Sequence, residues 1–354
     1  MDREMQWERE IRQGDQWGKQ VGPNWETEKR MNCRFSGGAG SGSSSSKKKK
    51  KKVEKNEKRL PCVNGFQLQR LLGQGSFGRV YLCKHRETGQ VACVKLESLD
   101  TTAAQVTYEH RLYESLKRTP AAPFVPRSLC CGQSGDYRYL VLALGGKDLS
   151  SIIDTYSVKE KLEVFRNLVA ALHAFHDAGI VHRDIKPRNI LLNPEGGKTD
   201  IWLVDLGLTK RYKLCGMHGD NCRKTSAVGT SRYSSVHSQM FCESSRRDDM
   251  YSCIYTAVSI FGRKLPWEGL KGTSKQKTIE TLRRKRFLPP SVVCRGCPPC
   301  VARIYQHVQQ LSFKDRPQYQ LYMDLITLDI PPDISPTTSS VVRYPRHPGH
   351  IGHR

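Results

Sequence analysis

Hydrophobic and polar residues alternate in short runs from residue 61 onward. Helical spacing over about 103–116 predicts a helix, and a further pair of strands is expected to end with the apolar run 139–144. Three apolar runs are separated by turn residues, which is typical of β-strands: 66–72, 79–83 and 91–96. The segment 61–144 is therefore predicted to be rich in β-structure.

Helical spacing dominates after Gly146. Ser157 and Glu160 fit a capping box at the start of a helix, and Gly179 is a stop signal. A β-rich segment followed by a mainly helical one, 145–331, predicts an α+β fold. The apolar face of the predicted helix is formed by residues at three- and four-residue spacing: Leu162, Phe165, Val169, Leu172 and Phe175.

The two ends of the chain are polar. Residues 1–60 and 332–354 are rich in serine, glycine, lysine or proline, and we predict disordered tails because little in them can be buried. Six consecutive lysines at 47–52 resemble a nuclear localisation signal. A solvated basic tail has the same composition, so both interpretations stay open.

The net charge of +24 is spread over the chain, with +7 in the first 60 residues and +17 in the remainder. This charge favours acidic partners such as phosphorylated protein, nucleic acid or anionic lipid. No apolar stretch approaches the roughly 18 to 20 residues of a membrane span. The charged start is unlike a secretory signal, so we expect a protein of the cytoplasm, the nucleus or both.

The 13 cysteines are predicted to be thiols, as is usual in a reducing compartment. Cys294, Cys297 and Cys300 form a CxxCxxC pattern that suggests zinc. A structural zinc site needs four ligands, usually as two separated pairs, and no second pair is evident. Chance clustering near a turn is therefore favoured over zinc.

A glycine-rich motif, GxGxxGxV, spans Gly73, Gly75, Ser76, Gly78 and Val80. Dinucleotide-binding turns share the GxGxxG spacing, but there the glycines open a helix. Here the apolar residues after the motif continue as a strand, which suits a hairpin whose backbone amides cover a triphosphate. An ordinary glycine-rich hairpin is the alternative.

Lys95 ends the next predicted strand and can reach the α- and β-phosphates of ATP if an acid holds it in place. Glu109, on the following helix, is the candidate acid. A solvated surface charge is the usual fate of either residue type. For Lys95 that alternative is weaker, because the residue terminates an apolar strand.

The sequence HRDIKPRN at 182–189 is far more specific. In it Asp184 can accept a substrate hydroxyl proton, Lys186 can neutralise charge on the transferred phosphoryl group, and Asn189 can hold a metal ion. Asp205 begins the sequence DLG after an apolar strand, and its carboxylate is a ligand of the kind that Mg²⁺ prefers.

The glycine-rich motif, the lysine, the glutamate, HRDIKPRN and DLG follow one another along the chain in this order. With these motifs, residues 64–330 resemble a eukaryotic-type protein kinase. More narrowly, the chain resembles the casein kinase 1 superfamily. That superfamily has a SIN-type sequence where most kinases carry APE, with GTARYAS before it and SRRDD after it. This chain reads GTSRYSSVH at 229–237, SRRDD at 245–249 and LPWEGLK at 265–271. KDRPQY at 314–319 is closer to the tau-tubulin kinase branch.

The resemblance implies a two-lobed fold, with a small antiparallel β lobe at 61–144 and a helical lobe at 145–331. It also implies a monomeric enzyme that uses ATP and Mg²⁺ and phosphorylates serine or threonine. Leu142 would be the gatekeeper, and Leu144 would lie in the hinge that binds adenine. Asp249 would anchor the backbone of the HRD turn. An apolar column linking the lobes would contain Tyr113, His182 and Leu206.

The resemblance further implies a substrate site for anions, since casein kinase 1 enzymes favour serines preceded by acidic or phosphorylated residues. Gly269 and Lys277 match two of its members if one gap is allowed after Lys271, and Arg223 and Lys224 are the nearest candidates for the third, an arginine. Leu206 replaces the phenylalanine of DFG, and Val236-His237 replaces Ile-Asn. Residues 213–228 do not align without gaps, which leaves substrate preference open.

The function predicted from these residues is a serine/threonine protein kinase that acts on acidic or pre-phosphorylated proteins. A pseudokinase scaffold is the alternative, and the presence of Lys95, Asp184, Asn189 and Asp205 weakens it. Specific nucleic-acid binding through the lysine run has little support, because no aromatic residues are interleaved to stack on bases.

Overall fold

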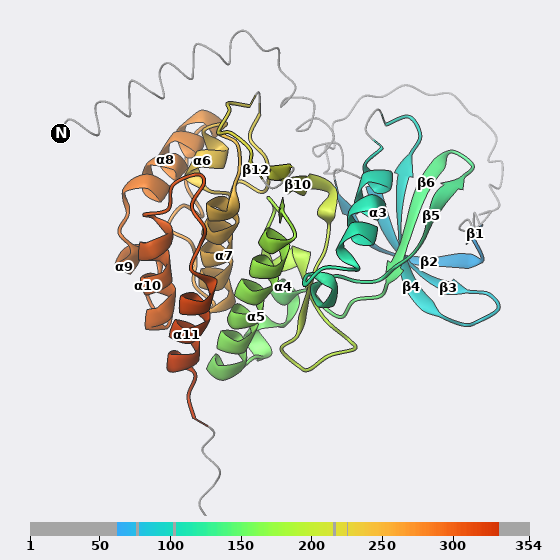
Figure 1. The fold of residues 1–354 in the computed structure, drawn as a ribbon, viewed down its shortest axis with the longest axis horizontal. Helices are drawn as coiled ribbons and strands as arrows, with labels where there is room; N and C mark the ends of the chain where they lie inside the picture. The colour runs from blue at the N-terminus through green and yellow to red at the C-terminus, as the bar shows by residue number, and fades with distance from the viewer. Residues whose placement is uncertain (1–61, 76–77, 102–103, 215–216, 225, 333–354) are drawn as a thin grey trace, which may run out of the picture. The chain divides into compact units, whose positions relative to one another are not determined.

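The computed structural model describes residues 62–75, 78–101, 104–214, 217–224 and 226–332 (Figure 1). The predicted tail 1–60 with its lysine run at 47–52, the predicted tail 332–354 apart from Pro332, and Ser76 lie outside these residues. The elements below belong to one unit, which covers 62–223 and 227–332 among the described residues.

The first half of this unit contains a six-stranded antiparallel sheet in the order β1-β2-β3-β4-β6-β5. The strand predictions are confirmed, and the strands are longer than the apolar runs. β6 ends at Ala143, one residue before the predicted end. The strands are β1 (Cys62–Val63), β2 (Phe66–Gly75), β3 (Gly78–His85), β4 (Val91–Ser98), β5 (Ser128–Ser134) and β6 (Tyr137–Ala143).

One long helix, α3 (Gln105–Leu116), packs against β4, β5 and β6 (Figure 1). The helix buries one face at three- and four-residue spacing, formed by Val106, Glu109, Leu112, Tyr113 and Leu116. The predicted helix over about 103–116 is thereby confirmed from residue 105 onward. On this face, Glu109 reaches the candidate site described below, where it bonds Lys95.

The rest of the unit, from residue 149 onward, is mainly helical. α5 (Val158–Asp177) begins at the predicted capping box, in which Ser157 and Glu160 bond reciprocally. It ends before Gly179, whose φ of +78° suits glycine at a helix end. The other helices are α4 (Leu149–Ile152), α6 (Val236–Gln239), α7 (Arg246–Ile260), α8 (Ser274–Phe287), α9 (Pro290–Val293), α10 (Pro299–Val308) and α11 (Tyr319–Asp329).

Short elements connect the sheet to these helices and carry the polar motifs. The 3₁₀ turns are η1 (Ala122–Phe124), η2 (Ile153–Thr155), η3 (Pro187–Asn189) and η4 (Leu206–Leu208). The antiparallel two-stranded pairs are β7 (Ile180–Val181) with β10 (Lys210–Arg211), β8 (Ile190–Leu192) with β9 (Ile201–Leu203), and β11 (Lys213–Leu214) with β12 (Met217–His218).

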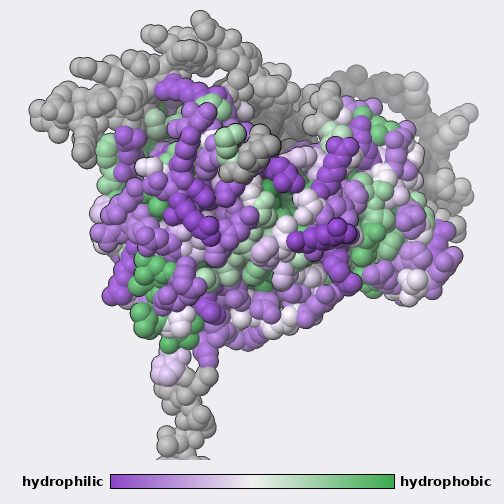
Figure 2. Space-filling view, viewed as in Figure 1, coloured by the Kyte–Doolittle hydropathy of each residue, from purple (hydrophilic) through white to green (hydrophobic). Residues whose placement is uncertain are grey.

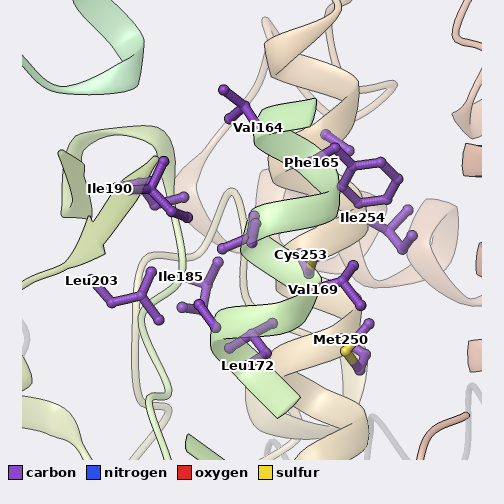
Figure 3. Close-up of a cluster of buried hydrophobic side chains, with 14 of the residues drawn as sticks. Val164, Phe165, Val169, Leu172, Ile185, Ile190, Leu203, Met250, Cys253 and Ile254 are labelled. Carbon is purple, nitrogen blue, oxygen red and sulfur yellow. The ribbon is translucent and has the colours of Figure 1, made fainter. Parts of the chain in front are cut away.

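The helical core lies around α5 and α7, and α7 is buried on nearly all sides. Figure 3 shows Ile185 reaching into this core near Leu172 and Leu203. Ile185 is 1% exposed, so burial of its side chain fixes the chain between Asp184 and Lys186. The fold therefore places two polar residues of the HRDIKPRN sequence on either side of an apolar anchor.

The cysteines of the CxxCxxC pattern contribute to packing. Cys294 and Cys300 are buried in the main hydrophobic cluster, and Cys297 packs against it. Burial raises the pKa of the Cys294 thiol to about 12. A neutral, apolar role in the core therefore agrees with their surroundings.

Figure 2 shows hydrophilic residues over most of the face that it displays, with hydrophobic residues in smaller groups. Among the described residues, no helix combines the length and apolar character needed to cross a bilayer.

Candidate active site

The glycine-rich motif forms an antiparallel hairpin between β2 and β3, in which Gly75 pairs with Gly78. Gly78 has a φ of +137°, and a Cβ there would lie 2.2 Å from the carbonyl oxygen of Leu96. Only glycine fits this position. The same hairpin pairs Val80 with Gly73 on β2, and the register of β3 with β4 pairs Val80 with Lys95. The motif residues and Lys95 therefore share one region of the sheet.

Lys95 lies at the centre of an ion-pair triad. Its Nζ donates to Glu109 Oε1 at 2.5 Å and to Asp205 Oδ1 at 2.8 Å. Glu109 comes from α3 and Asp205 from the DLG sequence before η4, so the lysine ties three separate elements together. The structure thus brings together residues that are 14 and 110 positions apart from Lys95 in the sequence.

The pKa values in the triad reflect competition between burial and charge. Burial opposes the charged form of Lys95, but the carboxylates of Glu109 and Asp205 outweigh it and raise the pKa of the ammonium. Burial raises the pKa of Glu109 to about 7, against the lowering effect of Lys95. Glu109 is 1% exposed, so its carboxylate depends on this lysine to remain ionised.

Asp205 has a left-handed backbone, with a φ of +62°, which is uncommon for a residue other than glycine. The turn is tied to α3, because Gln105 Nε2 donates to the carbonyl of Gly207 at 2.5 Å and Tyr108 Oη donates to that of Thr209 at 2.7 Å. Neither Gln105 nor Tyr108 was identified from the sequence, since their partners lie about a hundred positions away.

The segment after β6 carries the predicted hinge. Leu142 is buried in β6 opposite Cys93 of β4, and Leu144 follows the strand and is half-buried. A Cβ on Gly145 would lie 2.6 Å from Leu191 Cδ1, so glycine allows the hinge to pass close to β8. Leu191, which the sequence did not single out, therefore lies beneath the hinge.

The backbone of the HRD turn is held by Asp249, which is 1% exposed in the first turn of α7. Its Oδ2 accepts from the amide of His182 at 2.7 Å, and its Oδ1 accepts from the amide of Arg183 at 2.8 Å. Arg183 has a φ of +71°. A buried carboxylate that satisfies two amides stabilises this uncommon backbone conformation.

Asp184 lies at the centre of a polar cluster and is 7% exposed. Lys186 Nζ donates to its Oδ2 at 2.6 Å, and Asn189 Nδ2 donates to the same oxygen at 3.0 Å. Burial would raise the pKa of the Asp184 carboxyl, but hydrogen bonds and charge from Lys186, with the Thr230 hydroxyl, hold it below its ordinary 3.8. Asp184 is therefore ionised at neutral pH.

Thr230 was not assigned a role from the sequence, although it belongs to the GTSRYSSVH segment. Its hydroxyl donates to Asp184 Oδ1 at 2.7 Å, its amide donates to the same oxygen at 2.9 Å, and it accepts from Lys186 Nζ at 2.9 Å. A Cβ on the preceding Gly229 would lie 2.4 Å from the carbonyl oxygen of Arg183. Glycine therefore allows this segment to lie against the HRD turn.

The residues predicted to bind metal have suitable donors. Asn189 uses its amide nitrogen to bond Asp184, which leaves its amide oxygen as an acceptor. The Asp205 carboxylate bonds Lys95 through one oxygen and is 37% exposed. Hard oxygen donors at a partly open position fit Mg²⁺.

The three residues predicted to form the apolar column, Tyr113, His182 and Leu206, are each at most 1% exposed. Leucine in place of phenylalanine therefore keeps an apolar side chain at this buried position.

The three residues of the predicted anion site are exposed and lie on separate segments. Arg223 forms a β-bridge with Cys242, Gly269 precedes α8 with a φ of +71°, and Lys277 lies in α8. Among the described residues, no hydrogen bond or ion pair joins the three.

The sequence matches the family model of the protein kinase domain over residues 66–311, which is more than half of the chain. All of the residues placed above lie within this range. The chain therefore belongs to the protein kinase domain family, with an antiparallel β lobe and a helical lobe. Enzymes of this family act on protein substrates with ATP and Mg²⁺.

Proposed function

We propose that this protein kinase phosphorylates serine and threonine, with Asp184 as the catalytic base. The observation that carries the proposal is the bond from the Thr230 hydroxyl to Asp184 at 2.7 Å. In Thr230 the hydroxyl is attached to Cβ, and this short side chain reaches the Asp184 carboxylate from the backbone of its segment. A substrate serine or threonine has a hydroxyl at the same distance from its backbone. The longer side chain of tyrosine would need the substrate backbone to lie farther from Asp184.

In the reaction, Asp184 orients the substrate hydroxyl and accepts its proton as the oxygen bonds to the γ-phosphorus of ATP. The bond from the γ-phosphorus to the β,γ-bridging oxygen breaks, and ADP leaves. Lys186 neutralises charge on the transferred group, and Lys95 holds the α- and β-phosphates. Bound Mg²⁺, held by Asn189 and Asp205, would neutralise phosphate charge.

The nucleotide site is proposed to lie beneath the glycine-rich hairpin. Gly73, Gly75 and Gly78 allow backbone amides to approach the phosphates, and the motif includes Ser76, which lies outside the described residues. Val80, with Leu142 and Leu144, would enclose the adenine through apolar surface and the backbone of the hinge. Glu109 takes part by keeping Lys95 in place.

We further propose a casein kinase 1 type enzyme that prefers acidic or pre-phosphorylated proteins. The segments 229–237, 245–249 and 265–271 support this placement through their resemblance to that superfamily. The charge of +17 outside the first 60 residues favours anionic substrates.

The proposal predicts Mg²⁺-dependent incorporation of phosphate from γ-labelled ATP into serine and threonine only. Labelled protein, with casein as substrate, would be hydrolysed and its phosphoamino acids separated. Labelled phosphotyrosine would contradict the proposed hydroxyl specificity. A folded protein without transfer to itself, to casein or to a peptide library would instead indicate a pseudokinase scaffold.

The predicted anion site has its own test. A peptide with phosphoserine three residues before the target serine should be used about three- to tenfold better than its unphosphorylated twin, because exposed charges are partly screened. Arg223→Glu with Lys277→Glu should remove this preference. The control, Arg118→Glu with Arg303→Glu, changes the net charge equally at two exposed positions and should keep it. If both double variants behave alike, these residues do not form the site.

A further inference from the structure

A buried lysine lies beneath the segment that carries Thr230. Lys285, near the end of α8, is 1% exposed. Its Nζ donates to the backbone carbonyls of Ser231 at 2.8 Å and Ser234 at 2.6 Å. Within the described residues, no carboxylate lies within ion-pair distance of Lys285. Its partners are therefore neutral carbonyl groups of another segment.

Two aromatic rings complete the surroundings of this ammonium. Lys285 Nζ lies 5.3 Å from the ring centroid of Tyr255 and 5.0 Å from that of Trp267. The negative faces of such rings attract a cation, most strongly where water is excluded. Trp267 also holds the same segment directly, because its Nε1 donates to the carbonyl of Arg232 at 2.8 Å.

Burial of an unpaired ammonium opposes folding, and lysine is rarely fully buried without a charged partner. An apolar side chain of similar size would avoid that cost. Such a side chain could not, however, donate hydrogen bonds to the carbonyls of Ser231 and Ser234. The lysine at this position therefore stabilises the conformation of residues 230–234.

This conformation leads directly to the proposed catalytic base. The carbonyl of Thr230 accepts from the amides of Tyr233 at 2.8 Å and Ser234 at 2.9 Å, which closes a turn. Lys285 holds two carbonyls of that turn, and Thr230 at its start bonds Asp184 through both its hydroxyl and its amide. A shift of the turn would move Thr230 away from Asp184.

We propose that Lys285 is a positioning residue, whose ammonium holds the turn 230–234 in place against Asp184 so that the substrate hydroxyl is oriented. This proposal rests on the proposed function, because it assumes that Asp184 is the base. It adds a residue that touches neither ATP nor substrate and acts through the backbone of the turn.

The hydrogen bonds from the Lys285 ammonium to the turn 230–234, called the hold below, depend on pH, because burial lowers the pKa of Lys285 to about 7. The carbonyls and ring faces act in the opposite direction. The ammonium is charged below this pKa, so the hold is strongest at low pH and weakens as pH rises through about 7. The neighbouring phenols stay neutral there, since burial raises the pKa of Tyr305 to about 12 and that of Tyr255 above its ordinary range.

Other charged groups lie on α8, on the segment 265–271 before it, and on α6, which packs against α8 and carries His237, paired with Asp248 at 3.4 Å. Glu280 accepts from Arg284 at 2.6 Å, and Glu268 pairs with Arg232. The remaining cation on this turn of α8 is Arg286. Arginine stays charged throughout this range, so the arginines do not account for a transition near neutral pH. His237 is present in wild type and in every Lys285 variant, so a ratio of their activities isolates the contribution of Lys285.

The first test compares wild type with Lys285→Met, using Lys264→Met at an exposed position as the control. The kcat/KM for peptide should fall by about ten- to a hundredfold, through a higher KM, a lower kcat or both, as expected for lost hydrogen bonds to a charged group. The KM for ATP should stay within about twofold, since among the described residues the turn makes no hydrogen bond to Lys95 or to the hinge. Unchanged peptide kinetics in folded Lys285→Met would overturn the proposal.

The pH profile separates positioning from packing. The ratio of kcat/KM for wild type to that for Lys285→Met should be largest near pH 6 and should shrink toward pH 8.5. Lys285→Arg, which stays charged, should restore much of the activity and remove this change of the ratio with pH. A ratio independent of pH would contradict a charge-dependent hold.

Hydrogen exchange on the full-length wild type gives a readout that needs neither a variant nor activity. The amides of Tyr233 and Ser234 should lose protection between pH 6 and 8.5, after correction for intrinsic exchange, whereas α5 amides should not. Constant protection would refute the hold even if Lys285→Met failed to fold. If no peptide is phosphorylated but this protection changes with pH, the proposed function fails while the hold stands.

Discussion

Asp184→Asn is expected to fold normally and to lower kcat by about 10²- to 10⁴-fold, which is the usual contribution of a general base. The amide keeps the size of the side chain, and its oxygen can still accept from Thr230. It cannot accept the substrate proton. The pKa of Asp184 lies below its ordinary 3.8, so its titration does not shape the activity profile near neutral pH.

The measurement is single-turnover phosphoryl transfer, with circular dichroism and nucleotide affinity as checks on folding. Asp154→Asn, an exposed carboxylate in the same lobe, is the matched control and should behave as wild type. Equal transfer by Asp184→Asn and wild type would show that another group accepts the proton.

Lys95→Met should abolish most transfer and also destabilise the protein. Removing one partner of a buried ion pair typically costs about 3 to 5 kcal/mol, because the other charge stays buried. Glu109 is the residue left behind, at 1% exposure. The free energy of unfolding, measured in urea, should therefore fall together with activity.

Two further observations distinguish lost stability from lost chemistry. Lys95→Met with Glu109→Gln should recover most of the stability without recovering transfer, since no buried carboxyl remains. In the single variant, stability should rise as pH is lowered from 8 to 5. The raised pKa of Glu109 means that the folded state binds this proton more readily than the unfolded chain. A single variant as stable as wild type at every pH would contradict this account.

Local pattern was sufficient for much of the fold. The turn-separated apolar runs predicted β2, β3 and β4, and the apolar residues after Gly78 predicted a hairpin instead of a helix. The capping box at Ser157 located the start of α5 correctly. These features depend on neighbouring residues, which sequence shows directly.

The connections between distant segments were not visible in the same way. Thr230 bonds Asp184 across 46 positions, and nothing in its immediate sequence distinguishes that threonine from an exposed one. Lys285 lies among several basic residues of α8, where helical spacing alone predicts a solvated cation. Its burial depends on Tyr255 and Trp267, which other segments bring to it.

Asp249 affects how readily the backbone of the HRD turn opens by local unfolding. The amides of His182 and Arg183 are bonded to a residue of α7, and this helix is buried on nearly all sides. Releasing either amide leaves the carboxylate of Asp249, which is 1% exposed, without that donor, and the loss of a hydrogen bond to a buried charge is costly. Exchange of these two amides should therefore report global unfolding, so that the catalytic backbone stays ordered until the whole lobe unfolds.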